Sequence, residues 1–273
     1  MNYMQAETIL FIIAALSYLL AAVLYIVFFT MKKEKPGEIA GWVLLAAFVV
    51  HTLALVVRSI GAGRLPFSNQ YEFATSFAWG IALAYLIFAR HKRYRALGTF
   101  VAPVIFLIIG YAAMQSRQVN ELMPALQSNW LSIHVSTAII SYGSFGVAFG
   151  GSLLFLMHGR LHQNEFTERY FPDKERLDLL NYRIICLGFT FLTLVIVTGA
   201  IWAQKAWGRY WTWDPKETWS LVTWIIYAIY LHLRISRGWR GDKAAWFAVI
   251  GFICVIFTYI GVNTWIPSIH SYA

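Results

Sequence analysis

Residues 207–219 read WGRYWTWDPKETW and place four tryptophans and one tyrosine within thirteen positions. Tryptophan favours the boundary between water and lipid, but an anchor at that boundary needs only one or two such residues. The density therefore predicts a flat aromatic platform for a large planar ligand, formed by Trp207, Tyr210, Trp211 and Trp213. Because Trp211 and Trp213 are two positions apart, their rings project from one face if the segment is extended.

Asp214, Pro215 and Glu217 have a structural explanation beside a functional one. Asp214 suits the N-cap of a helix, Pro215 suits its first position, and Glu217 lies three positions after the cap. Such a capping box satisfies the backbone N–H groups at the start of a membrane helix. We expect these residues to begin a helix, and we also assign Asp214 to the edge of the aromatic platform.

Three of the seven histidines lie at depths that suit a ligand to iron. His134 lies one turn after Trp130, and His270 lies in the C-terminal tail, so both are expected level with the tryptophan segment. His232 follows Trp219 by thirteen positions, which at ~1.5 Å per residue places it ~20 Å deeper. One iron cannot be shared across that depth, so if these histidines bind haem there are two separate sites.

A neutral imidazole is a common haem ligand, and two imidazoles on opposite faces make a low-spin centre. His134 and His270 are the expected pair beside the aromatic platform. Lys205, Arg209 and Lys216 are the cations available for the propionates of a haem there.

Each histidine also has an alternative interpretation. The outer pair could be ordinary solvated histidines at the membrane surface. His232 lies inside a predicted span, where an ionisable side chain is functional by default, but a structural hydrogen bond competes with a role as the inner haem ligand. His51, near the middle of another span, has no supporting motif, and its role stays open.

The elements that position these residues are transmembrane helices. The chain of 273 residues is 59% apolar and only 13% charged, and long uncharged runs approach the ~20 residues that cross a hydrocarbon core. Their continuous apolarity excludes a transmembrane barrel. We predict an all-α integral membrane protein, one domain over residues 1–273, with about eight spans at 8–31, 39–57, 73–89, 96–116, 122–159, 184–204, 218–233 and 244–273.

Lys and Arg set the orientation. The loops after spans one, three, five and seven carry 16 of the 22 basic residues: Lys32, Lys33, Lys35, Arg90, Lys92, Arg93, Arg95, Arg160, Arg169, Lys174, Arg176, Arg183, Arg234, Arg237, Arg240 and Lys243. Loops rich in Lys and Arg stay on the cytoplasmic side of a membrane. Both termini and the segment 204–219, between spans six and seven, are therefore predicted to face outward. This asymmetry accounts for most of the formal charge of +9 and gives no reason to expect nucleic acid as a partner.

Five sequence stretches together resemble one family. They are WGRYWTWDPKETW, YAIYLHLR at 227–234, NWLSIHVSTAIISYGSF at 129–145, PFSNQYE at 66–72 and the terminal GVN…HSY. In combination they resemble the CcsA family of cytochrome c biogenesis proteins, called ResC in some bacteria, whose tryptophan-rich "WWD" domain holds haem. By this resemblance, His134 and His270 match the outer axial ligands, and His232 matches the ligand of a second haem within the membrane.

The resemblance implies a function and partners. The expected function is transport of haem b and its covalent attachment to the C-x-x-C-H segment of apocytochrome c, as a subunit of a cytochrome c–haem lyase that needs its companion ResB or CcsB. That companion would supply the ligand opposite His232, and a thioredoxin-like thiol reductase is a further expected partner. The expected location is the bacterial plasma membrane or the thylakoid membrane.

Two other functions remain as alternatives. The same platform could load haem onto another carrier without forming a bond, as a haem chaperone or exporter. A transporter or channel with a tryptophan-lined mouth is a more distant alternative, because the spans contain hardly any ionisable groups besides His51 and His232.

Overall fold

The computed structural model describes residues 2–88, 91–158 and 165–266. This part of the chain is helical and has no β-strand. Three short helical turns (Lys92–Leu97, Pro124–Leu126 and the π-helical turn Phe257–Gly261) accompany ten helices: α1 (Tyr3–Met31), α2 (Glu34–Ala62), α3 (Gln70–Phe88), α4 (Gly98–Ala113), α5 (Asn129–His158), α6 (Glu165–Tyr170), α7 (Lys174–Trp207), α8 (Pro215–Arg237), α9 (Asp242–Ile256) and α10 (Val262–Trp265).

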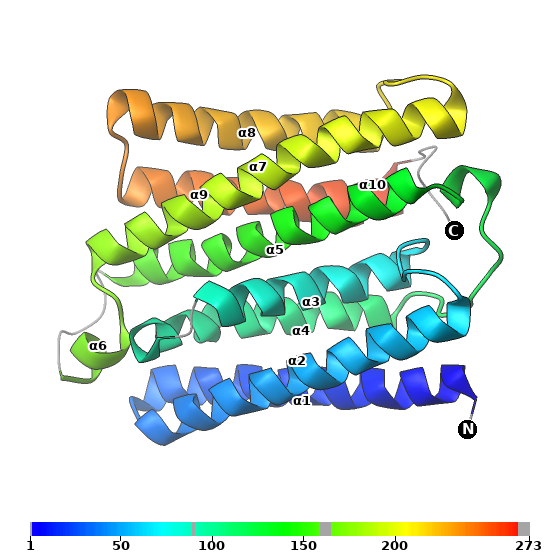
Figure 1. The fold of residues 1–273 in the computed structure, drawn as a ribbon. Coiled ribbons are helices and arrows are strands. Elements are labelled where there is room, and N and C mark those ends of the chain that lie inside the picture. The colour runs from blue at the N-terminus through cyan, green and yellow to red at the C-terminus, as the bar shows by residue number, and fades with distance from the viewer. Residues whose placement is uncertain (1, 89–90, 159–164, 267–273) are drawn as a thin grey trace.

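The long helices run up and down as one bundle (Figure 1). The start of α1, the α2–α3 and α4–α5 connections, the α7–α8 connection and α10 all lie at one end, which we call the strip end. The α1–α2 and α8–α9 connections lie at the opposite end. The up-and-down path of the helices therefore places the tryptophan segment and the start of α1 at the same end of the bundle.

Seven helical segments of the described residues are long and apolar enough to cross a membrane. They correspond to seven of the eight predicted spans, and the chain is a multi-pass membrane protein. The eighth predicted span is α8, whose 23 residues are also long enough at ~1.5 Å per residue. It is not among the seven because Trp, Tyr, Thr and His interrupt its apolar residues. Figure 1 nevertheless shows α8 running the length of the bundle beside α7.

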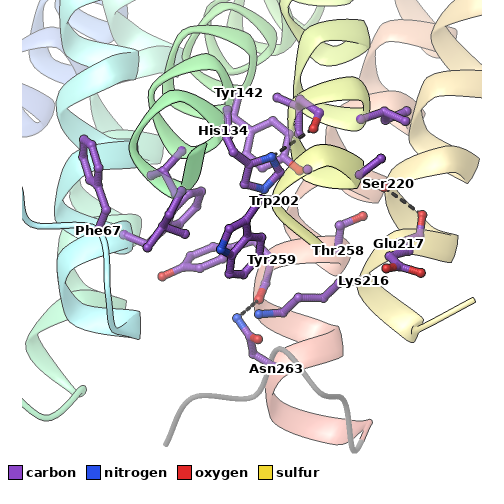
Figure 2. A pocket seen from close by; sticks show the side chains of 18 of the residues that line it. Phe67, His134, Tyr142, Trp202, Lys216, Glu217, Ser220, Thr258, Tyr259 and Asn263 are labelled. Atoms are coloured by element: carbon purple, nitrogen blue, oxygen red, sulfur yellow. Dashed lines mark hydrogen bonds between the residues drawn. The ribbon is translucent and has the colours of Figure 1, made fainter. Parts of the chain in front are cut away.

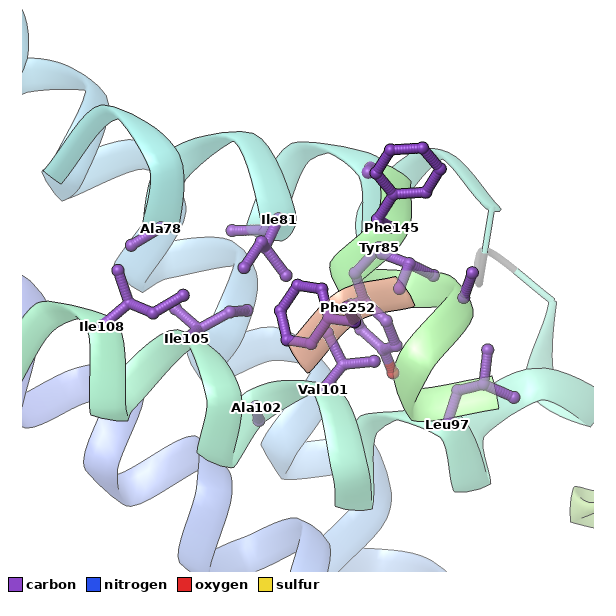
Figure 3. Packing of buried hydrophobic residues seen from close by; sticks show 14 of the residues in the cluster. Ala78, Ile81, Tyr85, Leu97, Val101, Ala102, Ile105, Ile108, Phe145 and Phe252 are labelled. Atoms are coloured by element: carbon purple, nitrogen blue, oxygen red, sulfur yellow. The ribbon is translucent and has the colours of Figure 1, made fainter. Parts of the chain in front are cut away.

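The centre of the bundle depends on close approach between α5 and its neighbours. A Cβ atom on Gly143 would lie 2.6 Å from the backbone of Gly80 in α3, and one on Gly150 would lie 2.5 Å from Val101 in α4. The sequence allows two uses for these α5 glycines, helix packing or room for a flat cofactor, and the structure shows packing. Figure 3 shows the adjoining apolar core, in which Phe145 of α5 and Phe252 of α9 meet side chains of α3 and α4.

Candidate functional site at the strip end

A cavity of about 180 Å³ opens at the strip end (Figure 2). Its walls come from six parts of the chain: the loop before α3 with the start of α3, the turn Pro124–Leu126, the first half of α5, the second half of α7, the tryptophan segment with the start of α8, and the π-helical turn with α10. The lining is mainly aromatic and aliphatic, with a few polar groups among it. That composition is typical of a site for a large organic ligand.

His134 of α5 lies in the wall of this cavity and is half-buried. Its Nδ1 lies 2.9 Å from the backbone oxygen of Val195 in α7. A carbonyl oxygen only accepts, so Nδ1 carries a proton and donates to it. The ring also stacks on Trp202, with the centroids 5.9 Å apart and the planes 23° from parallel. Both contacts fix the orientation that an imidazole ligand needs.

The tryptophan segment contributes unequally to the cavity. Tyr210 and Trp211 line it. Trp207 instead packs on Trp202, with ring centroids 4.9 Å apart, and so supports the ring that stacks on His134. Trp213 is 68% exposed and meets Trp211 edge to face, at 86°.

The path of the backbone explains why the two rings do not share a face. Trp213 has φ 60°, in the left-handed region that bulky residues rarely occupy. The segment is therefore not extended through Trp213, whereas the prediction that both rings project from one face requires an extended segment. The two ring planes are almost at right angles.

The capping box predicted from Asp214 and Glu217 is confirmed. The side chain of Asp214 accepts from the backbone N–H of Lys216 at 3.0 Å, and Glu217 accepts from the backbone N–H of Asp214 at 3.2 Å. Glu217 also accepts from the backbone N–H of Thr212 at 2.8 Å. Asp214 is buried and does not line the cavity. In this structure it caps the start of α8, and Glu217 holds the preceding segment in place.

One set of polar groups in the cavity lies near α8 and α10. Lys216 is the only Lys or Arg among the described residues that line it, whereas Lys205 and Arg209 are exposed and lie outside the lining. Trp211 Nε1 and Asn263 Oδ1 are buried and have no hydrogen-bond partner among the described residues. In Figure 2 the side chain of Lys216 extends toward Asn263.

The wall next to α3 is held by a buried carboxylate. The loop residues Ser68, Asn69 and Gln70 line the cavity, and Glu72 follows them with no exposed surface. Glu72 accepts from the backbone N–H of Ser68 at 2.8 Å and forms ion pairs at 2.8 Å with Arg58 and with Arg64. A further acid, Glu7 of α1, lies 4.0 Å from Arg58 and accepts from the Tyr71 hydroxyl.

His232 and His51 do not line the cavity. His232 is exposed on the outside of α8 and does not line the cavity, so the structure separates it from His134. His51 is fully buried, with Nδ1 3.4 Å from the Tyr18 hydroxyl. His270 lies outside the described residues.

Trp202, Tyr142 and Tyr259 line the cavity but were not predicted as site residues. Each lies within an apolar run, where an aromatic residue is usually part of the core. A weak signal was present for Trp202, because Gly199 precedes it by three positions and leaves space on the same face of α7. Only the packing of α7 on α5 shows that this face meets His134.

The family profile described as "Cytochrome C assembly protein" matches residues 67–270. "Cytochrome c biogenesis protein CcsA" of Prochlorococcus marinus (strain MIT 9515) is 38% identical over 256 residues, which cover 84% of this chain and 81% of that protein. The chain belongs to the CcsA family.

Two further CcsA proteins match most of this chain. The CcsA protein of Guillardia theta is 34% identical, with 95% of this chain and 94% of that protein covered. The CcsA protein of Chlamydomonas reinhardtii is 43% identical over 227 residues, which cover 81% of this chain and only 64% of that protein. The chain therefore spans less than two thirds of the length of the Chlamydomonas reinhardtii protein.

A solved structure shares the fold of this CcsA-family chain. The "Cytochrome c Heme Lyase CcmF" superposes with a TM-score of 0.73 at 16% sequence identity, covering 95% of this chain and 47% of that chain. The likeness extends over nearly all of the bundle. At 16% sequence identity the superposition supports the arrangement of the helices and nothing beyond the fold.

Proposed function

We propose that the strip-end cavity holds haem for covalent attachment to apocytochrome c. The observation that carries the proposal is the geometry of His134, whose ring is oriented by Val195 and Trp202 in the wall of a cavity lined mainly by aromatic and aliphatic side chains. Membership of the CcsA family and the haem lyase CcmF as a structural neighbour support the same function. Haem b is the expected cargo.

The second axial ligand in this proposal is His270. The described chain ends at Ile266, three residues after Asn263, which lines the cavity. Four further residues reach His270 and extend at most ~14 Å at ~3.5 Å per residue. The tail is therefore long enough for its imidazole to approach iron on the side opposite His134.

His232 belongs to a second site in this proposal, shared with the companion subunit ResB or CcsB. It is exposed on the same face of α8 as Ile225 and Ile229, at spacings of three and four positions. An exposed histidine on a stripe of this kind suits contact with another transmembrane helix, which would supply the opposite ligand. Haem would pass from this site to the strip end.

The strip end is proposed to lie outside the cytoplasm, in the plasma membrane of a bacterium or on the lumenal side of a thylakoid. Most Lys and Arg of the connections lie at the opposite end of the bundle, including Lys32, Lys33, Arg237 and Arg240. Basic connections stay on the cytoplasmic side. An apocytochrome delivered to the outer side would then meet the cavity directly.

The attachment itself is an addition and needs no external oxidant. Each thiol of the C-x-x-C-H segment adds across one vinyl group, so a C–S bond forms, the S–H bond breaks and the hydrogen ends on the neighbouring vinyl carbon. The chain contributes orientation and exclusion of water, because the reactivity belongs to the haem and the thiol. A thioredoxin-like reductase is the expected source of the reduced thiols.

The proposal is tested by the haem content of the chain purified with its companion subunit. We expect His134→Ala to lose most of the strip-end haem while the protein still inserts, and the matched variant His91→Ala, an exposed histidine at the opposite end, to keep it. An equal haem content in both variants would contradict the proposal. Thioether formation on a C-x-x-C-H peptide then distinguishes a synthase from a haem chaperone that forms no bond.

A further inference from the structure

Two polar side chains of the π-helical turn bond within the chain, and the asparagine that follows the turn does not complete its bonds. The Tyr259 hydroxyl donates to the backbone oxygen of Gln70 at 2.8 Å. The Thr258 hydroxyl donates to the backbone oxygen of Cys254 at 2.7 Å. Asn263 also lines the cavity, but its Oδ1 is buried and has no partner among the described residues. A buried acceptor without a partner is costly, so a donor from outside these residues is expected.

The other end of the Asn263 amide fixes its orientation. Its Nδ2 donates to the backbone oxygen of Tyr259 at 2.6 Å. A carbonyl oxygen only accepts, so the amide nitrogen faces Tyr259 and Oδ1 is the end left over. In Figure 2 the side chain of Lys216 extends toward Asn263, but Oδ1 accepts no hydrogen bond from it. Oδ1 is therefore available to an N–H or O–H group that a ligand brings.

Haem itself does not carry such a donor. Once iron is bound, the porphyrin nitrogens hold no hydrogen, and ionised propionates only accept hydrogen bonds. The N–H group that accompanies a haem iron is that of an axial imidazole. The second nitrogen of a ligating imidazole usually donates to a carboxylate, a carbonyl oxygen or water.

His134 already has a contact of this kind, because its Nδ1 donates to the backbone oxygen of Val195 at 2.9 Å. Asn263 belongs to a different element, α10. In Figure 2 it lies at the other end of the lining from His134, with Trp202 and Tyr259 between them. This separation suits an acceptor for a second imidazole, on the face of the porphyrin opposite His134.

We propose that Asn263 accepts a hydrogen bond from the N–H of the imidazole that binds the iron opposite His134, and so positions the second axial ligand. The proposal rests on the proposed function, in which that imidazole belongs to His270, and adds a positioning residue to it. The contact would fix the rotation of the ring and raise its basicity as a ligand. Each axial imidazole would then have its own oxygen acceptor on the chain.

The test compares imidazole with N-methylimidazole, which binds iron through its unsubstituted nitrogen but has no N–H. Both are titrated into the haem-loaded complex with its companion subunit in nanodiscs, and the low-spin spectrum reports binding. His232→Ala removes the second site from the measurement, and His270→Gly vacates the position opposite His134. We expect imidazole to bind about fivefold or more tightly, because the methylated ring leaves Asn263 Oδ1 unpaired. Equal affinity for the two ligands would overturn the proposal without any substitution of Asn263.

Three variants in the same background separate the hydrogen bond from other causes. Asn263→Leu keeps the approximate size of the side chain and removes the acceptor. Its preference for imidazole should disappear, while its affinity for N-methylimidazole stays that of the unsubstituted background. Asn263→Asp keeps an acceptor and should retain the preference. Asn120→Leu, at an exposed asparagine of the same end, should keep it in full.

Failure of this proposal is distinguishable from failure of the proposed function. An undiminished preference in Asn263→Leu would assign the preference to the size of the methyl group and overturn the role of Asn263. A His270→Gly complex that stays low-spin without added ligand would overturn the pairing of Asn263 with His270. Both results leave haem binding standing. A chain with His134 and His270 intact that holds no haem at the strip end would overturn the proposed function itself.

Discussion

The ring of His134 packs directly against Gly199 of α7. A Cβ atom at Gly199 would lie 2.8 Å from His134 Cε1 and 3.0 Å from Nδ1, closer than carbon contacts allow. Gly199 therefore provides the space in which the histidine bonds to Val195 and stacks on Trp202. A residue without any ligand chemistry thus determines where the imidazole lies.

Gly199→Val should displace the His134 ring and lower the haem content of the strip-end site by about tenfold or more, since small misplacements of a site group carry large costs. Haem content and the visible spectrum of the purified complex measure the effect. Gly110→Val is the matched control, because a Cβ at Gly110 of α4 meets nothing within 4 Å. Equal haem content in the two variants would show that the position of His134 does not matter.

Glu72→Gln should destabilise the protein strongly. The substitution removes a negative charge from a carboxylate with no exposed surface and leaves Arg58, 2% exposed, without its nearest partner. Breaking a buried ion pair in this way costs about 3–5 kcal/mol. Thermal unfolding in detergent measures the loss, with the exposed Glu121→Gln as control. Equal midpoints for the two variants would contradict the structural role of Glu72.

Trp213→Asn should leave the midpoint of thermal unfolding unchanged or raise it. Trp213 has φ 60°, a conformation that costs about 1–3 kcal/mol for most residues and that Asn tolerates. If the ring contributes to the haem platform, the same variant binds less haem. Trp265→Asn removes another exposed tryptophan at a helical position and serves as control. A clearly lowered midpoint in Trp213→Asn alone would contradict the account of strain.

The sequence predicted the parts of this structure that depend on local pattern. Long uncharged runs predicted the helices, and the D-P-K-E stretch predicted the capping box that begins α8 at Asp214. Depth along the chain separated His232 from His134, and the structure places them apart. Each of these features follows from the order and spacing of residues within one segment.

Features that depend on contacts between segments were not predictable. Trp202 and Tyr259 lie in apolar runs, and only the packing of α7, α5 and the π-helical turn brings them to one cavity. The left-handed conformation of Trp213 follows from backbone hydrogen bonds to Glu217 around it. Nothing in the sequence pairs Arg58 and Arg64 with Glu72, and the structure shows both forming ion pairs with this buried carboxylate.

The central claim is that His134 binds the iron of a haem at the strip end, and imidazole rescue tests it most directly. In a His232→Ala background, the complex purified with its companion subunit should show a low-spin spectrum. His134→Gly should lose it, and added imidazole should restore it by occupying the space of the missing ring. An unchanged low-spin spectrum in His134→Gly, or no recovery with imidazole in protein that still elutes as the parent does, would contradict the claim.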